Sequence, residues 1–399
     1  MRVLQLSYRF PYPPKDGGAI GIFNITRGLS NQGVDLTLLT VNTPKHYFDQ
    51  KALPKDVAKL ANWEVVDVNT QITPLNAFAN LLDGKPFHVS RFEDHGFKQR
   101  LIDLLQQGSF DIIQLEGPFM GPYLNTIRAN SSAKVVLRMH NIEHKIWKRL
   151  ANEVSNPFKK IYINLQANRL HKYEKSLFHE VDGLVPITEQ DASFLKEISC
   201  DTPYEIVPAF VDLKELDPIK YEGTWPDFFF IGGLDWMPNW EGLLWFLNQV
   251  WPKVESKYPE SKFHIAGRNA PDRLKSLKSE QIVYHGEVED AFKFMSEHGI
   301  MVVPLFSGSG MRLKIIEGLG MKKPIISTSI GSEGMSVRHD RGLLIADDAE
   351  SFISEIDRLA SNKAFAESLG ESGNETIKQA YDIESNSKKL IEFYQTLLN

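Results

Sequence analysis

The amino-acid sequence predicts an α/β protein made of two doubly wound, Rossmann-like domains that face a cleft. The chain has 399 residues, which is enough for two domains of about 200 residues each. Short apolar runs alternate with helical segments in the first half, and the same alternation begins again after a polar stretch. Strands that alternate with helices are typical of parallel sheets covered by helices on both faces.

Apolar runs predict the strands of the first half, and Gly33 marks the expected end of its first helix, because glycine readily adopts a left-handed conformation. The predicted strands span residues 3–7, 34–41, 110–115, 134–139, 183–187 and 204–208. In the second half, strands are predicted at residues 227–232, 262–267, 283–286, 300–304 and 324–328.

The boundary between the two domains is expected at residues 209–226, because this stretch is polar, lacks strong periodicity and contains Pro218. The predicted N-terminal domain therefore comprises residues 1–208, and the predicted C-terminal domain comprises residues 227–383. A last helix, at residues 384–399, is expected to pack back on the N-terminal domain.

The composition argues against several classes of protein. A net charge of −6 and a pI near 6.0 give no general attraction to nucleic acid, and no motif of that kind occurs. The single cysteine, Cys200, excludes an intramolecular disulfide framework and is typical of a reducing compartment. The apolar start is too short for a signal peptide, and no window approaches the roughly 18 apolar residues of a membrane span. We therefore expect a cytoplasmic protein.

The most informative stretch is residues 304–328, which read PLFSGSGMRLKIIEGLGMKKPIIST. A strand should run into a Ser/Gly loop, a helix should open near Gly310, and a second strand should follow. The small loop residues and the positive end of the helix dipole favour a phosphate, and Arg312 and Lys314 add two cations there. Glu317 lies on the polar face of the helix, so it should point toward a bound ligand.

A structural explanation of the same residues stays open. Lys314 and Glu317 are three positions apart and could form a surface pair worth about 0.2–0.5 kcal/mol. Glycine-rich turns between strands and helices are also common in α/β proteins without any ligand.

Two segments of the first half are further candidates. Gly17 and Gly18 could bring backbone donors close to a ligand, although a tight turn explains two glycines about as well. They do not form a GxGxxG fingerprint, so nothing indicates a dinucleotide cofactor. His140 directly follows a predicted strand, which is where ligands bind in open α/β sheets, although single histidines are often structural.

Residues 134–175 form a basic segment, with ten basic residues against three acidic ones. The segment is either a solvated helical face or a docking surface for an anionic acceptor or lipid headgroups. The second possibility would give a peripheral contact with an anionic membrane.

Several blocks of the second half resemble the donor domain of glycosyltransferase family 4, in the same order. These blocks are residues 230–246 (FIGGLDWMPNWEGLLWF), 250–252 (VWP), 267–269 (GRN), 286–288 (GEV), 307–317 (SGSGMRLKIIE) and 331–334 (GSEG). In the first half, residues 10–18 (FPYPPKDGG) and 140–143 (HNIE) resemble the glycine loop and the acceptor-side histidine segment of that family. The similarity covers most of the chain and is more specific in the second half.

This resemblance implies a GT-B fold with a nucleotide-sugar donor in the cleft and an acceptor on the N-terminal domain. It also implies transfer with retention of anomeric configuration and without a metal or other cofactor. Glu317 would bind the ribose hydroxyls, and His140 would lie near the reacting sugar carbon, so these two are the catalytic candidates. The implied donor-site residues are Gly17, Gly18, Gly233, Arg268, Gly286, Val288, Ser309, Gly310, Met311, Arg312, Leu313, Lys314, Glu317, Glu333 and Gly334, and the implied acceptor-site residues are Asn141 and Glu143.

The sequence departs from the family pattern at three places. Ser309 stands where many members carry a first glutamate, and residues 232–234 (GGL) stand where an arginine is usual. Ile20 and Gly21 occupy a position after the glycine loop that is often arginine. The cations left for the diphosphate are Arg268, Arg312 and Lys314.

We therefore expect a retaining, metal-independent glycosyltransferase that extends a glycan or a lipid-linked glycan, as in bacterial surface-polysaccharide synthesis. An enzyme alternative is a nucleotide-sugar epimerase or a phosphorylase on the same fold, although nothing marks a lysine for pyridoxal phosphate. The non-enzyme alternative is a nucleotide-sugar-binding protein that has lost activity, which Ser309 and the missing arginine keep open.

Overall fold

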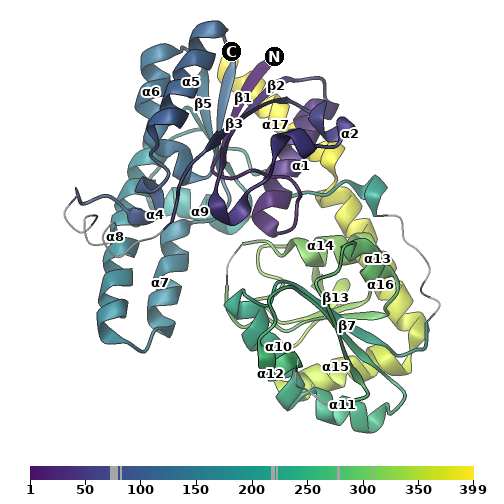
Figure 1. The fold of residues 1–399 in the computed structure, drawn as a ribbon. Coiled ribbons are helices and arrows are strands. Elements are labelled where there is room, and N and C mark those ends of the chain that lie inside the picture. The colour runs from purple at the N-terminus through teal and green to yellow at the C-terminus, as the bar shows by residue number, and fades with distance from the viewer. Residues whose placement is uncertain (72–79, 81–82, 217–220, 222, 276–278, 309) are drawn as a thin grey trace. The chain divides into compact units, whose positions relative to one another are not determined.

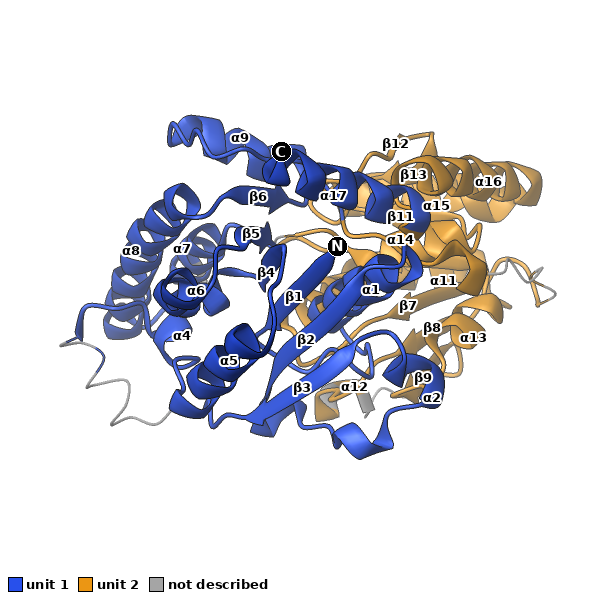
Figure 2. Ribbon diagram, turned by 90° about the horizontal axis from the view of Figure 1, so that it is seen from above, with its two compact units in different colours: residues 1–208, 384–399 blue, residues 209–383 orange. Residues whose placement is uncertain are grey.

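The computed structural model describes the chain apart from residues 72–79, 81–82, 217–220, 222, 276–278 and 309. The described residues form two compact units, which are coloured separately in Figure 2. Unit 1 comprises Met1–Pro208 together with Glu384–Asn399, and unit 2 comprises Ala209–Ile383. Each unit has its own sheet and its own hydrophobic core.

Unit 1 contains a six-stranded parallel sheet with the order β3-β2-β1-β4-β5-β6 (Figure 1). The strands are β1 (Arg2–Ser7), β2 (Asp35–Asn42), β3 (Asn62–Asp67), β4 (Ile112–Glu116), β5 (Lys134–Met139) and β6 (Gly183–Pro186). The central strands are almost wholly buried, which explains their nearly continuous apolar sequences. The strand order reverses at β1, so β1 and β4 flank the switch point at which such sheets bind ligands.

Two parts of this sheet differ from the prediction. β3 was not among the predicted strands, because Trp63 is its only buried residue and the strand therefore lacks a continuous apolar run. Residues 204–208 do not form a strand, although Tyr204 makes an isolated bridge to Leu184, and the N–H groups of Glu205 and Val207 donate to the carbonyls of Leu184 and Pro186. Pro186 of β6 has no N–H to donate in return, so the ladder does not continue.

Helices join the strands of unit 1 and cover its sheet. Asp16 caps the first helix by accepting a hydrogen bond from the Ala19 N–H, and Gly33, with φ of 74°, lies just beyond its end as expected. The helices are α1 (Gly17–Asn31), α2 (Lys55–Ala58), α4 (Phe87–Ser90), α5 (His95–Gln107), α6 (Leu124–Asn130), α7 (Glu143–Glu153), α8 (Pro157–Glu180), α9 (Glu189–Glu197) and α17 (Ile383–Leu398), with short 3-10 turns at Pro44–His46, Gln50–Ala52 and Pro118–Tyr123.

The last helix, α17, packs against unit 1, although the residues before it belong to unit 2. Tyr394 is fully buried and its hydroxyl donates a hydrogen bond to Gln114 in the middle of β4. Phe393 and Leu397 fill the space beside Gly183 of β6, where a side chain would collide with them. A side of the unit 1 sheet is therefore completed by the C-terminal end of the chain.

Unit 2 contains a seven-stranded parallel sheet with the order β12-β13-β11-β10-β7-β8-β9. The strands are β7 (Phe228–Ile231), β8 (Phe263–Ala266), β9 (Ile282–Gly286), β10 (Ile300–Val303), β11 (Ile325–Ser327), β12 (Arg338–His339) and β13 (Gly342–Ile345). The helices are α10 (Met237–Gln249), α11 (Trp251–Lys257), α12 (Asp272–Lys275), α13 (Ala291–Ser296), α14 (Leu313–Gly320), α15 (Ala349–Ser361) and α16 (Lys363–Ala380), with a 3-10 turn at Leu213–Glu215.

The segment expected to be a linker, residues 209–226, is part of unit 2 in the structure. The backbone of Val211 bonds to Tyr381 and Ile383, and Leu216 fills the space beside Gly320 of α14. Its lack of periodicity therefore reflects an irregular segment that is anchored by backbone hydrogen bonds and one buried leucine. Residues 217–220 and 222 of this segment lie outside the described residues.

The helices that the structure describes include none with the combination of length and apolar character needed to cross a bilayer.

Candidate functional site

The loops after β1, β4 and β5 bring polar side chains together at the carboxyl edge of the unit 1 sheet. Glu116 ends β4, His140 follows β5, and Tyr8 follows β1. The parallel register places Glu116 beside Ser7 of β1 and beside Arg138 of β5. The rings of Tyr8 and His140 meet edge to face with 6.1 Å between their centroids.

His140 is held by the buried carboxylate of Glu116. The Nε2 atom of His140 lies 2.7 Å from Oε2 of Glu116, and a guanidinium nitrogen of Arg138 lies 3.7 Å from the same oxygen. Glu116 is fully buried and Arg138 is 1% exposed, so this group of charges is shielded from solvent.

The environment sets the protonation of this pair. Burial disfavours the charged form of Glu116, but the hydrogen bond with His140 and the charge of Arg138 outweigh it and lower the pKa of the carboxyl. Burial also lowers the pKa of His140, against the opposing effect of Glu116. Near neutral pH the pair is therefore a carboxylate and a neutral imidazole that donates through Nε2–H, which leaves Nδ1 of His140 as an acceptor.

Two glutamine side chains satisfy the second oxygen of Glu116. Nε2 of Gln5 donates to Oε1 of Glu116 at 2.7 Å, and the Gln114 amide donates to the same atom. Thr26 of α1 donates to the amide oxygen of Gln5, and Tyr394 of α17 donates to that of Gln114. A buried hydrogen-bond network of residues from β1, α1, β4 and α17 thus fixes the carboxylate that orients His140.

The glycine loop lies beside this network. Gly18 is in close contact with Tyr8, Arg9 and Asp16, because a Cβ there would lie 3.2 Å from the hydroxyl of Tyr8. Arg9 and Asp16 form a two-pronged ion pair at 2.7 and 3.1 Å. Asp16 also caps α1, so Gly17 and Gly18 form the first turn of a helix whose start is held by a fixed ion pair.

A group of packed rings, here called the aromatic wall, lies next to His140, and one of its rings belongs to α4. The wall consists of Tyr8, His88, Phe92, Phe119 and Trp147. The ring of His88 contacts those of Phe119 and Trp147, at centroid distances of 5.0 and 5.2 Å, and Tyr8 packs on Phe119 and Phe92. Burial lowers the pKa of His88 to about 3, so this ring is neutral at neutral pH.

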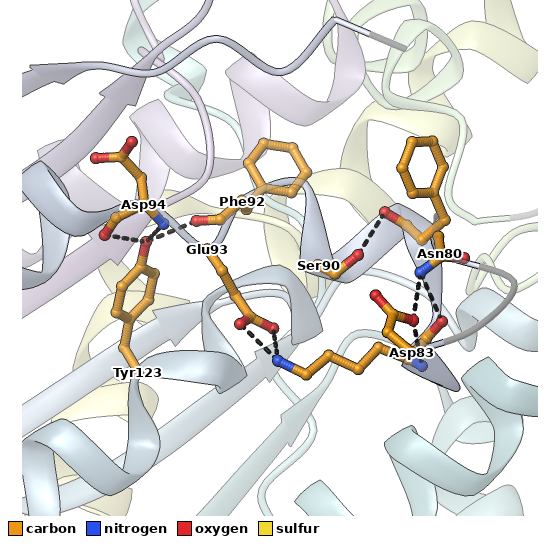
Figure 3. Close-up of polar contacts among 9 residues, drawn as sticks. Asn80, Asp83, Ser90, Phe92, Glu93, Asp94 and Tyr123 are labelled. Atoms are coloured by element: carbon orange, nitrogen blue, oxygen red, sulfur yellow. Dashed lines mark hydrogen bonds and ion pairs between the residues drawn. The ribbon is translucent and has the colours of Figure 1, made fainter. Parts of the chain in front are cut away.

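Polar contacts on both sides of α4 hold this segment in place (Figure 3). Tyr123 donates to the carbonyl of Phe92 and accepts from the N–H of Asp94, while Asn80 bonds to Asp83. Gln166 of α8 donates to the side chain of Asn80. The aromatic wall is therefore braced by α8.

Asn141 and Glu143, the two predicted acceptor-site residues, lie just before and at the start of α7, whose first N–H groups are bound by a side chain of α8. Glu174 of α8 accepts hydrogen bonds from the N–H groups of Glu143 and His144 at 2.8 and 3.0 Å, and so caps α7 from a distance. Burial, together with the neighbouring Glu174, raises the pKa of Glu143 to about 8. Asn141 is half-buried, whereas the Glu143 side chain is buried against Glu174.

In unit 2, the second group of polar side chains lies at the carboxyl ends of β7, β8 and β10. Nζ of Lys314 donates to the Ile231 carbonyl at 3.2 Å and to Oδ1 of Asn239 at 2.8 Å, over the ring of Phe230. A Cβ at Gly232 would lie 3.1 Å from Nζ of Lys314, so glycine is needed here for the lysine head to fit. Burial and the charge of Arg312 lower the pKa of Lys314 to about 7.

Two arginines lie in the same group. The guanidinium of Arg312 donates to the Gly310 carbonyl at 2.7 Å and lies over the ring of Trp236. The guanidinium of Arg268 lies 3.7 Å from a carboxylate oxygen of Asp235, beside Gly233. The structure thus gathers Gly233, Arg268, Arg312 and Lys314 around one edge of the sheet.

Helix α14 starts at this edge, and no described side chain caps its first turn. It begins at Leu313 rather than near Gly310, because Gly308 and Gly310 have φ of 100° and 79° and keep the loop out of helical geometry. The first N–H groups and the dipole of α14 can therefore hold an anion. Ser309 lies outside the described residues.

Glu317 does not pair with Lys314, because the lysine head turns to Ile231 and Asn239. Among the described residues, none bonds to the Glu317 carboxylate, and burial raises its pKa to about 7. The surface-pair explanation of these two residues is therefore wrong. A half-buried carboxyl without a protein partner is suited to a ligand with hydroxyl groups.

The other predicted residues lie in loops of unit 2. Gly286, with φ of 76°, is the last residue of β9, and the half-buried Val288 follows it. Glu333 and Gly334, the latter with φ of 77°, follow β11. Met311 precedes α14 and Leu313 is its first residue.

Comparison with known families matches both halves of the chain. Residues 15–215 match the model of the family described as Glycosyltransferase Family 4. The chain belongs to glycosyltransferase family 4. Residues 225–362 match a second model, described as Glycosyl transferases group 1.

Individual proteins resemble this glycosyltransferase over nearly its whole length. A Klebsiella pneumoniae protein, named as an uncharacterized 44.6 kDa protein in the cps region, is 24% identical over 393 residues and 96% of each chain. A sucrose-phosphate synthase from Thermosynechococcus elongatus has a TM-score of 0.73 at 14% identity, covering 100% of this chain and 99% of that one. Anabaena HepE in complex with UDP has a TM-score of 0.67 at 11% identity, covering 99% and 100%. These structural likenesses show the GT-B fold.

Sequence reasoning missed Glu116 and Asn239 as part of these groups. A usable signal for Glu116 was an acidic residue at the carboxyl end of an apolar strand, in the strand before the one that leads to His140. For Asn239 the sequence offers no comparable signal, because its contact with Lys314 joins residues 75 positions apart.

We predict that His140 of this glycosyltransferase is neutral at pH 7 and carries its proton on Nε2. Burial lowers its pKa, and the bond to the Glu116 carboxylate selects that tautomer. Nitrogen-15 NMR of histidine-labelled protein, with His140→Gln for assignment, measures both properties. Glu116→Gln should abolish the single tautomer. A proton on Nδ1, or a charged ring at pH 7, would contradict the assignment.

Proposed function

We propose that this glycosyltransferase transfers a sugar from a nucleoside-diphosphate sugar to a glycan or lipid-linked glycan acceptor, with retention of anomeric configuration and without a metal ion. Unit 2 would bind the donor and unit 1 the acceptor. The observation that carries the proposal is the start of α14. Uncapped N–H groups, Arg312 and Lys314 lie together there, and none of the residues that the structure describes bonds to the Glu317 carboxylate.

Each part of a nucleotide-sugar has a suitable partner in unit 2. The N–H groups of α14 and the two cations suit a diphosphate, which carries concentrated negative charge. Glu317 can accept hydrogen bonds from ribose hydroxyls, and Gly286 and Val288 would border the base. Glu333 and Gly334 would line the sugar side.

The comparisons support a donor of this class and a role in polysaccharide synthesis. The solved structures of Anabaena HepE include complexes with UDP and with UDP-glucose. The Klebsiella pneumoniae relative is named for a cps region. UDP-sugars are therefore the first donors to test, and a surface polysaccharide precursor is the first acceptor class.

The chemical task of such a transferase is to stabilise the leaving diphosphate. The helix dipole and the cations neutralise charge as it develops, and the leaving diphosphate takes part in deprotonating the acceptor hydroxyl. Neutral His140, with Nδ1 as acceptor, would orient a hydroxyl of the transferred sugar. Asn141 and the aromatic wall would contact the acceptor.

Incubation with UDP-, GDP- and ADP-sugars without acceptor tests the function. We expect slow hydrolysis of one donor to free sugar and nucleoside diphosphate, unchanged after treatment with EDTA, because dipole and cations neutralise the phosphates. Loss of activity in EDTA, restored by Mg²⁺ or Mn²⁺, would contradict metal independence. Interconversion of nucleotide-sugars would instead identify an epimerase, and binding without turnover an inactive binding protein.

Replacing Glu317 by alanine should weaken nucleotide binding by about 1.5–3 kcal/mol, or roughly 10- to 150-fold, because the ribose hydroxyls lose a charged acceptor. Isothermal titration with the ribonucleotide measures the loss. The 2′,3′-dideoxynucleotide serves as the control, and its affinity should change little. Equal losses for both ligands would show that Glu317 does not bind the ribose.

The α7–α8 hairpin is proposed to contact an anionic membrane, where lipid-linked acceptors reside. Helices α7 and α8 lie side by side and project from unit 1 (Figure 1). Phe158 is 82% exposed and Ile161 67%, and with Leu165 they follow the i, i+3, i+7 spacing of one helical face. Lys159 and Lys160 stand exposed beside them, so apolar and basic groups occur together as interfacial helices require.

Vesicle co-sedimentation tests this contact. Lys159→Glu/Lys160→Glu should reduce binding to vesicles with anionic lipid and weaken its salt dependence, because each cation near such a surface contributes about 1 kcal/mol. Lys98→Glu/Lys253→Glu, which changes two exposed lysines outside the hairpin, should bind like the unmodified protein. Absence of binding by the unmodified protein would exclude the lipid contact.

A further inference from the structure

Three histidines gather on the unit 2 sheet, and none of them belongs to the loop or helix at the start of α14. His264 lies on β8, His285 lies on β9, and His298 lies between α13 and β10. One ring nitrogen from each lies within 4.8 Å of the others. Nδ1 of His264 and Nε2 of His285 are 2.9 Å apart, and the rings of His264 and His298 are stacked with centroids 4.0 Å apart.

The carboxylate of Asp227 lies close to ring nitrogens of two of these histidines. Its carboxylate oxygens lie 3.2 Å from Nδ1 of His298 and 3.4 Å from Nε2 of His264, and it accepts a hydrogen bond from Tyr221 at 3.0 Å. The contact with His298 is a hydrogen bond, which occupies Nδ1 of that ring. Oδ1 of Asp227, the oxygen nearer His264, has no hydrogen-bond partner among the described residues.

The buried Nε2 atom of His298 has no hydrogen-bond partner among the described residues. His298 is 7% exposed, so water reaches this nitrogen poorly, and a buried polar atom without a partner is unfavourable. The neighbouring Lys323 does not fill the gap, because its ammonium donates to the carbonyls of Ser296 and His298. A bound cation would satisfy the Nε2 lone pair.

The arrangement has the chemistry of a transition-metal site. Histidines that bind metals usually donate their other ring N–H to a carboxylate, which is the role Asp227 has toward His298 and is placed to have toward His264. In a tetrahedral zinc site, bonds of about 2.0–2.1 Å place ligand nitrogens about 3.3 Å apart. The His264–His285 pair therefore has to open by about 0.4 Å, and His298, which is stacked on His264, has to approach by up to about 1.5 Å, because the nitrogens of the group lie as much as 4.8 Å apart.

A metal ligand must present a ring nitrogen that carries no proton. Nδ1 of His264 and Nε2 of His285 are hydrogen-bonded to each other, so one of these two nitrogens carries a proton in the absence of an ion. That proton has to move to the other nitrogen of its ring, or be released, when a metal binds. His285 is exposed, which gives an ion access from solvent.

We propose that His264, His285 and His298 bind one divalent transition-metal ion of the zinc type, oriented by Asp227 and completed by a water molecule. Asp227 and His298 stand just before β7 and β10, at the opposite edge of the sheet from Gly233 and Arg312. The ion would tie β9, the last strand of the sheet, to β8 and to the segment before β10. Its role is therefore structural and separate from sugar transfer.

Calorimetric titration of the untagged, EDTA-treated full-length protein with Zn²⁺ tests the site. We expect one equivalent to bind and the melting temperature to rise. His285→Ala and His264→Ala should each weaken Zn²⁺ binding at least tenfold and remove the thermal shift. His179→Ala changes an exposed histidine of unit 1 and serves as the matched control that retains wild-type affinity.

Two outcomes would overturn the proposal. The first is the absence of a stoichiometric Zn²⁺ site in the unmodified protein, and the second is unchanged affinity in His285→Ala. The His285 side chain is exposed, so this variant decides the matter even if His264→Ala fails to fold. None of the three histidines belongs to the loop or helix at the start of α14, so EDTA should lower the melting temperature while the rate of donor hydrolysis stays unchanged.

Discussion

Parallel pairing of every strand is the constraint on which both units depend. Parallel neighbours are rarely joined by a tight turn, so the connections cross the sheet, usually through a helix. The two-residue strand β12, which only residues 340–341 separate from β13, is the exception. Within each sheet, the loops that lead from a strand into a helix therefore lie at the same edge. In unit 1 this edge carries Glu116 and His140, and in unit 2 it carries Arg268 and Lys314. The strand direction thus explains why the candidate residues of each unit lie together.

The alternation of apolar runs was sufficient to predict the α/β class and most strands, since buried parallel strands are nearly continuous apolar stretches. The loop before α14 was likewise predictable, because its small residues, its cations and Glu317 are neighbours in sequence. Pairings between distant segments were not predictable. The contacts of Glu116 with His140 and of Asn239 with Lys314 depend on strand register and on where a helix packs. Residues 204–208 have strand composition, but their pairing with β6 is interrupted at Pro186, which has no N–H to donate.

Buried charge is treated differently in the two units. In unit 1, Glu116 receives hydrogen bonds from Gln5, Gln114 and His140, so its charge is fully compensated by protein groups. In unit 2, burial brings the pKa of Lys314 and that of Glu317 to about 7, and no described group bonds to the Glu317 carboxylate. The first arrangement resembles a rigid support, which positions a neighbour. In the arrangement of unit 2, the Glu317 carboxylate can still accept hydrogen bonds, as expected of a group that binds a ligand.

The chain passes between the units twice, at residues 208–209 and at residues 383–384. Two backbone hydrogen bonds join these passages: the N–H of Val211 donates to the carbonyl of Tyr381, and the N–H of Ile383 donates to that of Val211. Tyr394, near the end of the chain, completes the hydrogen bonding of Gln114, which itself bonds to Glu116. The two units are thus not separable by a single cut in the gene. A chimaera that exchanges one unit between related enzymes has to be joined at both passages. Helix α17 then stays with unit 1, and the hydrogen bonds from Tyr394 through Gln114 to Glu116, which orients His140, are kept.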